Sequence, residues 1–591
     1  MRFLDNPPRH LFFTGKGGVG KTSIACATAV VLARRGKRVL LVSTDPASNV
    51  GQVFGTAIGN RVTAITQVPG LSAIEIDPAQ AAADYREKIL APVRALLPPV
   101  EIAAITEQLS GSCTTEIASF NEFTMLLADP TETAGFDHVI FDTAPTGHTI
   151  RLLQLPGSWT SFLDQGKGDA SCLGPMSGLE KNRATYRAAV QALTDPGTTR
   201  LVLVARAQTS TLSEVARTHD ELSALGIRPT HLVLNGVLPP SPAGDSLHQA
   251  IRDREQQVLA NLPATLTGMA TDEIALKPTN MVGLPALEHL FSDDLPPGEA
   301  PEAALVGGDA PAGLSSLIDD LEAQGHGLVM TMGKGGVGKT TIAAAIAVAL
   351  AERGHRVHLT TTDPAAHLSA TLEAGVANLT VDAIDPEQAT QAYRDRVMAT
   401  KGKNLDDAGR AVLMEDLMSP CTEEVAVFQQ FSRAVNQART QFVVMDTAPT
   451  GHTLLLMDAT GSYHRDIMRH LDESQRARNT TPLMRLQDPG HTRIIIVTLP
   501  ETTPILEAEE LVEDLERAHI HPWAWVVNNS LSAAAPTSPF LVRRANNEAE
   551  HLKRVRAIAP RVAVVPLQTR EPIGVPALED LARPQEVLAA R

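Results

Sequence analysis

The sequence predicts an α/β protein with two homologous halves, each a mostly parallel sheet with helices on both faces. The octapeptide Gly-Lys-Gly-Gly-Val-Gly-Lys-Thr occurs twice, at 15–22 and at 333–340. Each copy lies between a short run typical of a strand and a longer apolar run typical of a helix. Strands that alternate with helices favour a parallel sheet covered on both faces. The duplication favours a pseudo-twofold internal dimer, formed within one monomeric chain.

Other motifs recur in the same order in both halves. Asp-Pro-Ala occurs at 45–47 and 363–365, Asp-Thr-Ala-Pro-Thr-Gly-His-Thr at 142–149 and 446–453, and Gly-x-Pro-Ala-Leu at 283–287 and 574–578. The separation between matching residues shrinks steadily along the chain, which indicates small insertions in the first half. A stretch rich in Pro, Ala and Gly follows residue 294 and is typical of a linker. We therefore expect domains at 1–294 and 323–591, joined by a linker at 295–322.

The strands place the motifs at one edge of each sheet. In the first half we expect strands at His10–Thr14, Arg38–Ser43, His138–Asp142, Arg200–Ala205 and His231–Asn235. The octapeptide and the two aspartate motifs then follow strand carboxyl ends. Ligands of open parallel sheets bind at that edge.

The octapeptide satisfies the G-x-x-x-x-G-K-[ST] pattern of a phosphate loop. Backbone N–H groups of such a loop surround the phosphates, the final lysine reaches the β and γ oxygens, and the hydroxyl holds Mg²⁺. The lysines are Lys21 and Lys339, and the magnesium ligands are Thr22 and Thr340. The remaining residues expected to bind nucleotide in the two loops are Gly15, Gly17, Gly18, Val19, Gly20, Ser23, Gly333, Gly335, Gly336, Val337, Gly338 and Thr341.

A second lysine follows the first glycine of each loop. These residues, Lys16 and Lys334, are called the signature lysines below. They indicate the deviant Walker A class, in which this lysine reaches the nucleotide held by the opposing half. A solvated lysine is the alternative.

Polar residues at strand ends complete the expected nucleotide site. Asp45 and Asp363 precede proline, which favours an extended backbone, and each carboxylate can orient or deprotonate the attacking water. Asp142 and Asp446 follow apolar strands and suit the Mg²⁺ side. The alternative for each aspartate is a helix cap or a turn. The amides of Asn235 and Asn528 can read the adenine edge, and here a turn asparagine remains open.

The combination of octapeptide, Asp-Pro-Ala and Asp-Thr-Ala-Pro-Thr-Gly-His-Thr resembles the arsenite-transporting ATPase family across both halves. The resemblance implies an ATPase that uses ATP and Mg²⁺ and is stimulated by arsenite or antimonite. It implies that the chain delivers the metalloid to a membrane efflux carrier and confers arsenic resistance. A cytosolic arsenite-delivering chaperone is a further implied partner. The resemblance also implies that the two aspartate motifs are nucleotide-responsive switches.

The resemblance gives meaning to three of the four cysteines. Trivalent As and Sb are thiophilic, so thiolates are natural ligands and imidazoles secondary ones. Cys113 and Cys421 are mates in the repeat, and Cys172 lies in an extra first-half loop at Gln165–Pro175. The implied ligands, called the metalloid set below and expected where the halves meet, are Cys113, Cys172, Cys421, His148, His452 and Ser419. The two histidines have a structural alternative. Cys26, inside an expected helix, is expected to be a small buried hydrophobe.

The composition of the chain restricts the classes of partner that it can bind. The chain has 591 residues and a formal net charge of −16, which argues against general nucleic-acid binding. Its first residues lack an apolar signal core, and its apolar runs are shorter than a bilayer requires. We expect a cytoplasmic protein, peripheral to the inner membrane when docked on its carrier, without direct membrane insertion.

Two other functions compete with this hypothesis. The related targeting ATPase for tail-anchored membrane proteins would be a single-half homodimer with a Cys-x-x-Cys zinc site, whereas this chain has two fused halves and no such pair. A partition or positioning ATPase would need a basic face or an amphipathic tail. Within the favoured hypothesis the two nucleotide sites are expected to be unequal, since the segment at 566–574 differs from its first-half counterpart at 275–283. Arg206 also matches Leu499 when Leu212 is aligned with Ile505. Neutral drift in surface loops is the alternative.

Overall fold

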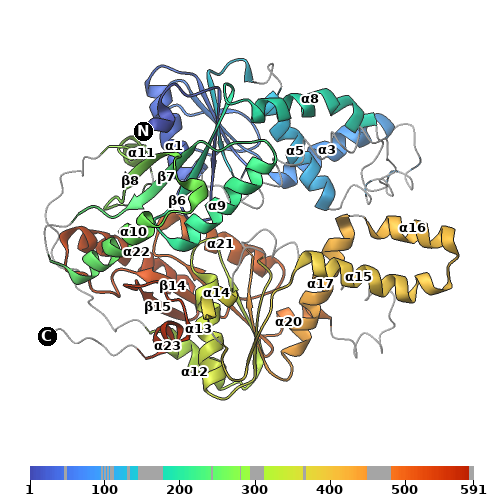
Figure 1. Cartoon of the computed structure of the whole chain (residues 1–591), viewed down its shortest axis with the longest axis vertical. Coiled ribbons are helices and arrows are strands. Elements are labelled where there is room, and N and C mark those ends of the chain that lie inside the picture. The colour runs from blue at the N-terminus through green and yellow to red at the C-terminus, as the bar shows by residue number, and fades with distance from the viewer. Residues whose placement is uncertain are drawn as a thin grey trace. The chain divides into compact units, whose positions relative to one another are not determined.

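The computed structural model describes each half of the chain as a separate unit. It describes residues 1–44, 50–94, 112–128, 133–143, 177–240, 244–279, 283–292, 312–363, 368–373, 375–418, 420–448 and 481–584, with isolated positions 98, 102, 106 and 281. One unit comprises Met1–Pro242 and Ile251–Gly298, and the other comprises Ala243–Ala250 and Glu299–Arg591. Both contain the expected α/β architecture (Figure 1).

The first unit is built on an eight-stranded sheet. Its strands are β1 (His10–Thr14), β2 (Val39–Ser43), β3 (Thr63–Ala64), β4 (Leu71–Glu75), β5 (His138–Asp142), β6 (Thr199–Ala205), β7 (His231–Val237) and β8 (Ala270–Ala275). Their order is β3-β4-β2-β5-β1-β6-β7-β8, and β3 is antiparallel to β4 whereas the other neighbours are parallel. The five strand predictions are confirmed.

Helices flank this sheet. They are α1 (Lys21–Arg34), α2 (Val50–Phe54), α3 (Pro78–Val93), α5 (Ser112–Ala128), α8 (Ser177–Thr194), α9 (Thr209–Ala224), α10 (Ser246–Ala260) and α11 (Leu284–Glu288), with 3₁₀ turns at Arg2–Leu4 and Ala264–Leu266. Although α10 follows β7 in the chain, its first residues cluster with the second unit.

Alternating side chains of β1 show why both faces are covered. Leu11 and Phe13 are buried in a core shared with α1, whereas Phe12 points into the opposite core. There Phe12 stacks on Phe141 with ring centroids 4.3 Å apart, and Phe123 of α5 meets it edge to face. A strand buried on both faces reads as the continuous apolar run seen in the sequence.

The second unit repeats the arrangement with seven parallel strands. They are β9 (Gly327–Met332), β10 (Val357–Thr361), β11 (Leu379–Val381), β12 (Phe442–Asp446), β13 (Thr492–Thr498), β14 (Ala524–Ser530) and β15 (Val562–Pro566), in the order β11-β10-β12-β9-β13-β14-β15. The order matches that of the first sheet without β3, as expected for a duplicated fold. The pseudo-twofold relation between the halves stays a prediction.

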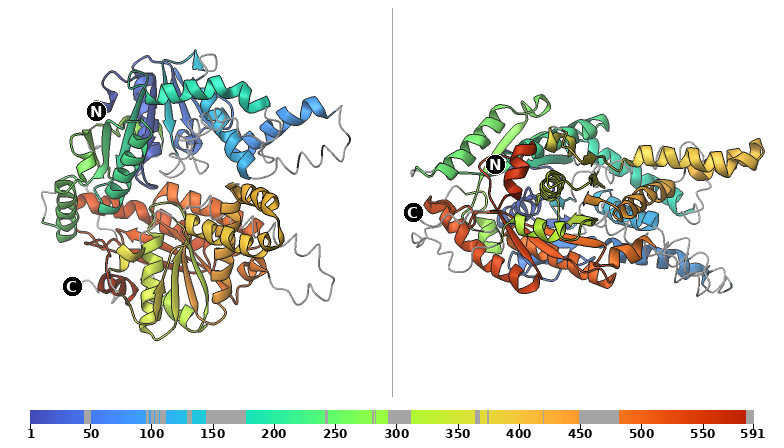
Figure 2. Two further views of the ribbon diagram at one scale, coloured as in Figure 1. Left: turned by 45° about the vertical axis from the view of Figure 1, so that its right-hand side comes forward. Right: turned by 90° about the horizontal axis from the view of Figure 1, so that it is seen from below.

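The helices of the second unit are α12 (Leu314–Glu322), α13 (Lys339–Glu352), α14 (Leu368–Leu372), α15 (Pro386–Thr400), α16 (Asp407–Leu417), α17 (Pro420–Gln437), α20 (Pro482–Gln487), α21 (Thr502–Arg517), α22 (Pro539–Ile558) and α23 (Val575–Ala582), with a 3₁₀ turn at Gly402–Asn404. Helix α15 packs against both α16 and α17, and this group lies beside the sheet (Figure 2). Local sequence signals explain where α22 begins. Ser538 caps the helix by accepting a hydrogen bond from the Leu541 amide, and Pro539 occupies the first helical position.

The expected linker at 295–322 ends in ordered structure. Its last residues form α12, whose Leu314, Leu317, Ile318 and Leu321 are buried in the core beside α13. This part of the expected linker therefore belongs to the second unit. Its apolar residues recur at helical spacing, which is the pattern of a helix that covers a core.

Candidate nucleotide and metalloid sites

Each phosphate loop lies tightly against the next strand of its sheet. The loops connect β1 to α1 and β9 to α13. A Cβ atom added at Gly15 would lie 2.1 Å from the Val204 carbonyl oxygen, and one at Gly333 would lie 2.3 Å from that of Val497. Only glycine permits this approach, so the first glycine of each loop has a packing reason as well as a chemical one.

The loop lysines lie at the starts of α1 and α13. The Lys21 ammonium donates to the Lys16 carbonyl oxygen at 3.2 Å, and the Lys339 ammonium donates to that of Lys334 at 2.9 Å. Both lysine side chains are buried although they carry charge. An incoming phosphate oxygen can replace the carbonyl as acceptor at little geometric cost, which suits the predicted role of these lysines.

Asn235 of β7 and Asn528 of β14, each two residues before the end of its strand, hold the loops. Asn235 Nδ2 donates to the Val19 carbonyl oxygen at 2.8 Å, and Asn528 Nδ2 donates to that of Val337 at 2.9 Å. The contact is the same in both halves, so it ties β7 and β14 to the loops. The predicted contact with adenine stays a prediction, and the sequence did not indicate this second task.

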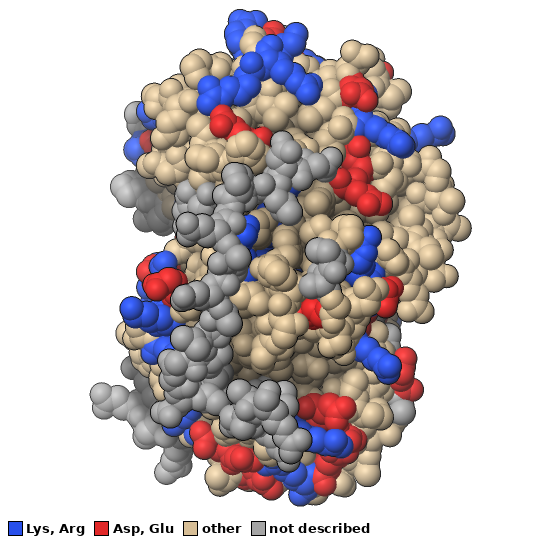
Figure 3. All heavy atoms as spheres, turned by 90° about the vertical axis from the view of Figure 1, so that its left-hand side faces the viewer, with Lys and Arg blue, Asp and Glu red and all other residues tan. Residues whose placement is uncertain are grey.

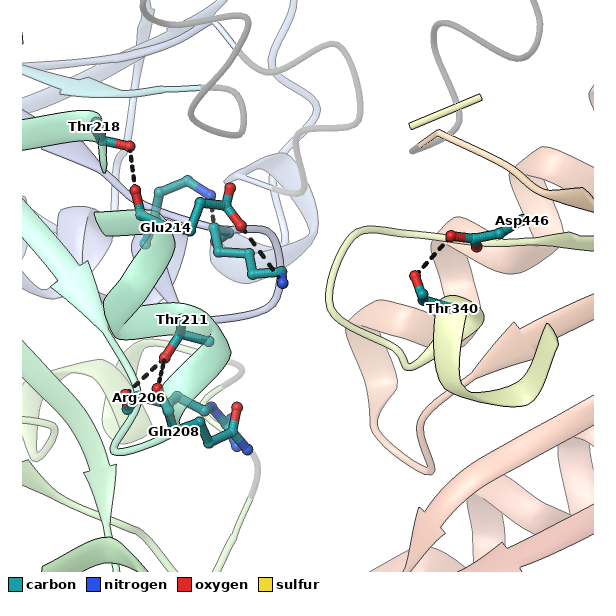
Figure 4. Close-up of polar contacts among 9 residues, drawn as sticks. Arg206, Gln208, Thr211, Glu214, Thr218, Thr340 and Asp446 are labelled. Atoms are coloured by element: carbon teal, nitrogen blue, oxygen red, sulfur yellow. Dashed lines mark hydrogen bonds and ion pairs between the residues drawn. The ribbon is translucent and has the colours of Figure 1, made fainter. Parts of the chain in front are cut away.

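Two aspartates are fully buried at the strand ends beside the loops. Asp142 ends β5 and Asp446 ends β12. Asp446 Oδ2 accepts from the Thr340 hydroxyl at 2.7 Å (Figure 4). The same oxygen accepts from the Thr361 hydroxyl at 3.3 Å. Asp446 Oδ1 is buried and has no hydrogen-bond partner among the described residues.

The Asp446 carboxylate and the Thr340 hydroxyl together fit a magnesium site. Burial raises the pKa of Asp446 to about 6, against the opposing effects of the Lys339 charge and the Thr340 hydrogen bond, while the Asp363 charge raises it further. A bound cation would lower that pKa by stabilising the carboxylate. Carboxylate and hydroxyl oxygens are the ligands that Mg²⁺ prefers. Thr22 occupies the same position in α1 as Thr340 does in α13.

Asp363, the predicted water-orienting aspartate of the second half, approaches this site. The Asp363 backbone N–H donates to the Thr361 hydroxyl at 3.0 Å, directly after β10. Its charge acts on Asp446, so two carboxylates meet at one strand edge. The equivalent Asp45 lies outside the described residues.

The signature lysines are held by glutamates that the sequence analysis missed. Lys16 Nζ lies 3.5 Å from Glu214 Oε2 of α9, and Lys334 Nζ pairs with Glu507 of α21. The glutamates occupy matching places in the second turn of the helix that follows β6 or β13. Their recurrence at the same place in the repeat was the available signal. The predicted reach toward the opposing nucleotide stays a prediction.

Arg206 distinguishes the two nucleotide edges. It follows β6, and its guanidinium carbon lies 4.0 Å from the place that a Cβ on Gly236 would take, next to Asn235. Its Nε is buried without a hydrogen-bond partner among the described residues. Leu499 follows β13 in the second half and packs partly buried against an apolar core. After this strand the first half therefore has a cation where the second has an apolar side chain. The inequality of the two nucleotide sites stays a prediction.

Most of the metalloid set lies outside the described residues. This holds for Cys172, His148, His452 and Ser419. The two cysteines that are mates in the repeat are each the second residue of a helix, Cys113 of α5 and Cys421 of α17. Within the described part of the chain, no cluster of three or more His, Cys, Asp or Glu side chains is arranged to hold a metal. The metalloid set stays a prediction.

Cys26 has the environment expected of a core residue. It is fully buried in α1 among apolar side chains. Burial raises the pKa of its thiol well above the ordinary value, and the charges of Asp142 and Glu75 raise it further. A thiol of this kind is a poor nucleophile and a poor metal ligand, so its expected role as a buried hydrophobe is confirmed.

The apolar character of the helices and the charge of the surface are relevant to the predictions about membrane and nucleic-acid partners. Among the described helices, none has the length and apolar character needed to cross a bilayer. The face in Figure 3 carries lysine and arginine interspersed with aspartate and glutamate.

Comparison with known proteins places these sites in a family. The model of a family described as anion-transporting ATPase matches residues 8–296, 326–486 and 458–585. The chain is 59% identical over 584 residues to an arsenical pump-driving ATPase of Escherichia coli, covering 98% of this chain and 100% of the relative. A protein of the same name from Acidiphilium multivorum is 58% identical over 583 residues, with the same coverage.

A second group of relatives matches a smaller part of the chain. The ATPase GET3 of Eremothecium gossypii is 33% identical over 263 residues, which is 40% of this chain and 75% of the relative. The likeness that covers nearly the whole chain is thus to the arsenical pump-driving ATPases.

Proposed function

The chain belongs to the anion-transporting ATPase family and is an ATPase, and from this premise we propose that trivalent arsenic or antimony stimulates its ATP hydrolysis. Its relatives over the full length are named arsenical pump-driving ATPases. We propose the same task here: the chain supplies the energy of ATP to a membrane efflux carrier for the metalloid. The observation that carries the proposal is the likeness to arsenical pump-driving ATPases over both halves. The loop, its lysine and a buried strand-end aspartate are present in each half, which supports the ATPase part of the proposal.

The chain's own residues account for the nucleotide chemistry. Backbone N–H groups of the loops bind the phosphates, and Lys21 and Lys339 turn from the loop carbonyls toward the β and γ oxygens. Mg²⁺ would be held by Thr340 and by Asp446 directly or through water, and it supplies charge neutralisation to the transferring phosphoryl group. Asp363 and Asp45 orient the attacking water.

Metalloid chemistry requires the soft ligands of the metalloid set. Two of its thiols, Cys113 and Cys172, come from the first half, and Cys421 comes from the second. A metalloid bound by all three therefore favours conformations that bring the halves together. If ATP favours the same conformations, metalloid and ATP each raise the affinity for the other. His148 follows Asp142 by six positions, as His452 follows Asp446, and this spacing provides a short link between the two sites.

The test is steady-state ATP hydrolysis with arsenite, antimonite or arsenate added. Arsenate is the matched control because it is an oxyanion of pentavalent arsenic and has no comparable affinity for thiolates. We expect stimulation by the two trivalent species alone. Equal rates with and without trivalent metalloid, in protein that binds ATP, would contradict the proposal.

A further inference from the structure

The signature lysine of each half forms an ion pair with a glutamate of its own half. The pairs are Lys16 with Glu214 and Lys334 with Glu507, and they arise from matching positions of the repeat. Figure 4 shows the Glu214 carboxylate directed at a lysine ammonium near the phosphate loop. Two independent halves that preserve the same charge pair suggest a task rather than a chance surface contact.

The position of the loop explains the pairing. Gly15 packs against the Val204 carbonyl oxygen at the end of β6, and α9 begins shortly after that strand. The next loop residue, Lys16, therefore lies beside the first turns of α9, where Glu214 is found. Gly333 and Val497 make the same contact before α21, which brings Lys334 to Glu507.

The two pairs differ in burial. The side chains of Lys16 and Glu214 are 31% and 12% exposed, whereas those of Lys334 and Glu507 are 19% and 3% exposed. Solvent screens a charge pair less as it becomes buried, and separating a buried pair is costly. The second half therefore holds its signature lysine more firmly than the first.

Each pair competes with the nucleotide. A lysine ammonium that reaches a phosphate oxygen must leave the carboxylate, because it cannot keep the same geometry with both. The backbone of each signature lysine is engaged as well, since its carbonyl oxygen accepts from Lys21 or Lys339. Capture of phosphate by the loop lysine frees this carbonyl and so loosens the residue that the glutamate holds.

From these contacts we propose that Glu214 and Glu507 are positioning residues that hold the signature lysines away from phosphate until ATP displaces them. Part of the binding energy of ATP is then used to separate the ion pairs. The glutamates act through the lysines and do not touch the reacting atoms. The proposal concerns nucleotide binding without metalloid, so its failure would leave the proposed metalloid stimulation standing.

The test measures the affinity of a slowly hydrolysed ATP analogue for Glu507→Gln and Glu214→Gln variants of the full chain. Glutamine keeps the size of the side chain and removes its charge. We expect binding to tighten about tenfold at the second loop and about threefold at the first, because charge-assisted pairs contribute more when they are buried. The KM for ATP should fall in parallel.

Matched controls lie on the same helices. Glu509 of α21 forms an ion pair with Arg554, and Glu221 of α9 forms one with Arg217. Both pairs lie near the surface, and Glu509→Gln and Glu221→Gln remove them. These variants should bind the analogue as the unmodified chain does. A purely structural glutamate would lower thermal stability on replacement without tightening nucleotide binding.

Glu507→Asp provides a conservative rescue. It keeps the charge on a shorter side chain, so its affinity should fall between those of the unmodified chain and Glu507→Gln. Unchanged or weaker analogue binding in the folded glutamine variants would overturn the proposal. If Glu507→Gln does not fold, Glu214→Gln decides the question in the other half.

Discussion

Replacing Gly338 with alanine tests the phosphate loop where the structure leaves least room. Gly338 has a φ of +95°, and a Cβ added there would lie 2.2 Å from Asn528 Nδ2. Ordinary van der Waals contact begins near 3.4 Å. The asparagine would have to withdraw by about 1 Å, and its hydrogen bond to the Val337 carbonyl oxygen would be lost.

The expected cost has two parts. Alanine in the left-handed region costs about 1 kcal/mol, wherever it occurs. Loss of the hydrogen bond between Asn528 and the loop adds about 1 kcal/mol and acts on the loop itself. The loop must also shift its backbone N–H groups away from the phosphates. We therefore expect ATP affinity at the second loop to fall about tenfold or more.

Gly354 supplies the matched control. It has a φ of +91°, and a Cβ added there meets nothing within 4 Å. Gly354→Ala should lower the free energy of unfolding by about 1 kcal/mol without weakening ATP binding. Nucleotide titration and chemical denaturation, in a Lys21→Ala background that leaves one intact loop, measure both quantities. Equal ATP affinities for the two alanine variants would refute the loop geometry described here.

The remaining predictions address catalysis, metalloid response, pH and the two sites. Asp363→Asn should keep ATP binding and slow single-turnover hydrolysis about 100-fold or more in the Lys21→Ala background, because a water-orienting carboxylate acts mainly in the transition state. Serine at each cysteine of the metalloid set should abolish most of the arsenite-dependent ATPase rate, since a hydroxyl is a poor ligand for soft metalloids. The pKa of Asp446 is raised to about 6, so Mg²⁺-dependent ATP binding at the second loop should weaken below that pH, by up to about tenfold per unit. Burial makes the ionised form of Asp446 less stable in the folded protein than in the unfolded chain. The free energy of unfolding of the nucleotide-free protein should therefore rise as the pH falls from about 6 toward 3.8, which denaturation curves measure. Lys21→Ala and Lys339→Ala should differ in residual ATP affinity, because the first half has Arg206 after β6 where the second has Leu499 after β13.

Each of these predictions has a contrary result. An unchanged single-turnover rate would remove Asp363 from the water-orienting role. A normal arsenite response in all three serine variants would exclude the thiolate site. Flat ATP affinity between about pH 5 and pH 7 would show that Asp446 does not titrate as burial implies. Equal affinities in the two lysine variants would show that the sites are equivalent.

The sequence predicted those features that depend on local pattern. Apolar runs of strand length located β1 and β5, and the glycine-lysine pattern located the loops, because each is fixed by a few adjacent residues. The buried aspartate at the end of β12 followed from its place after an apolar run.

Features that depend on distant parts of the chain were harder to predict. Nothing near Glu507 indicates that a lysine 173 residues away lies against it. The same holds for Asn528, whose amide binds the loop carbonyl of Val337 across 191 residues. These contacts arise only when each loop packs on its neighbouring strand. The glutamate and the asparagine each recur at the matching place of the repeat, but no periodic pattern in the sequence marks either residue.

The most direct test of the central claim is reciprocal linkage between ATP and metalloid. In an Asp45→Asn, Asp363→Asn double variant, which should bind ATP without rapid turnover, antimonite affinity is measured with and without ATP. ATP affinity is then measured with and without antimonite. The account predicts that each ligand tightens the other by the same factor, because both favour one conformation. Independent binding of the two ligands in both titrations would contradict it.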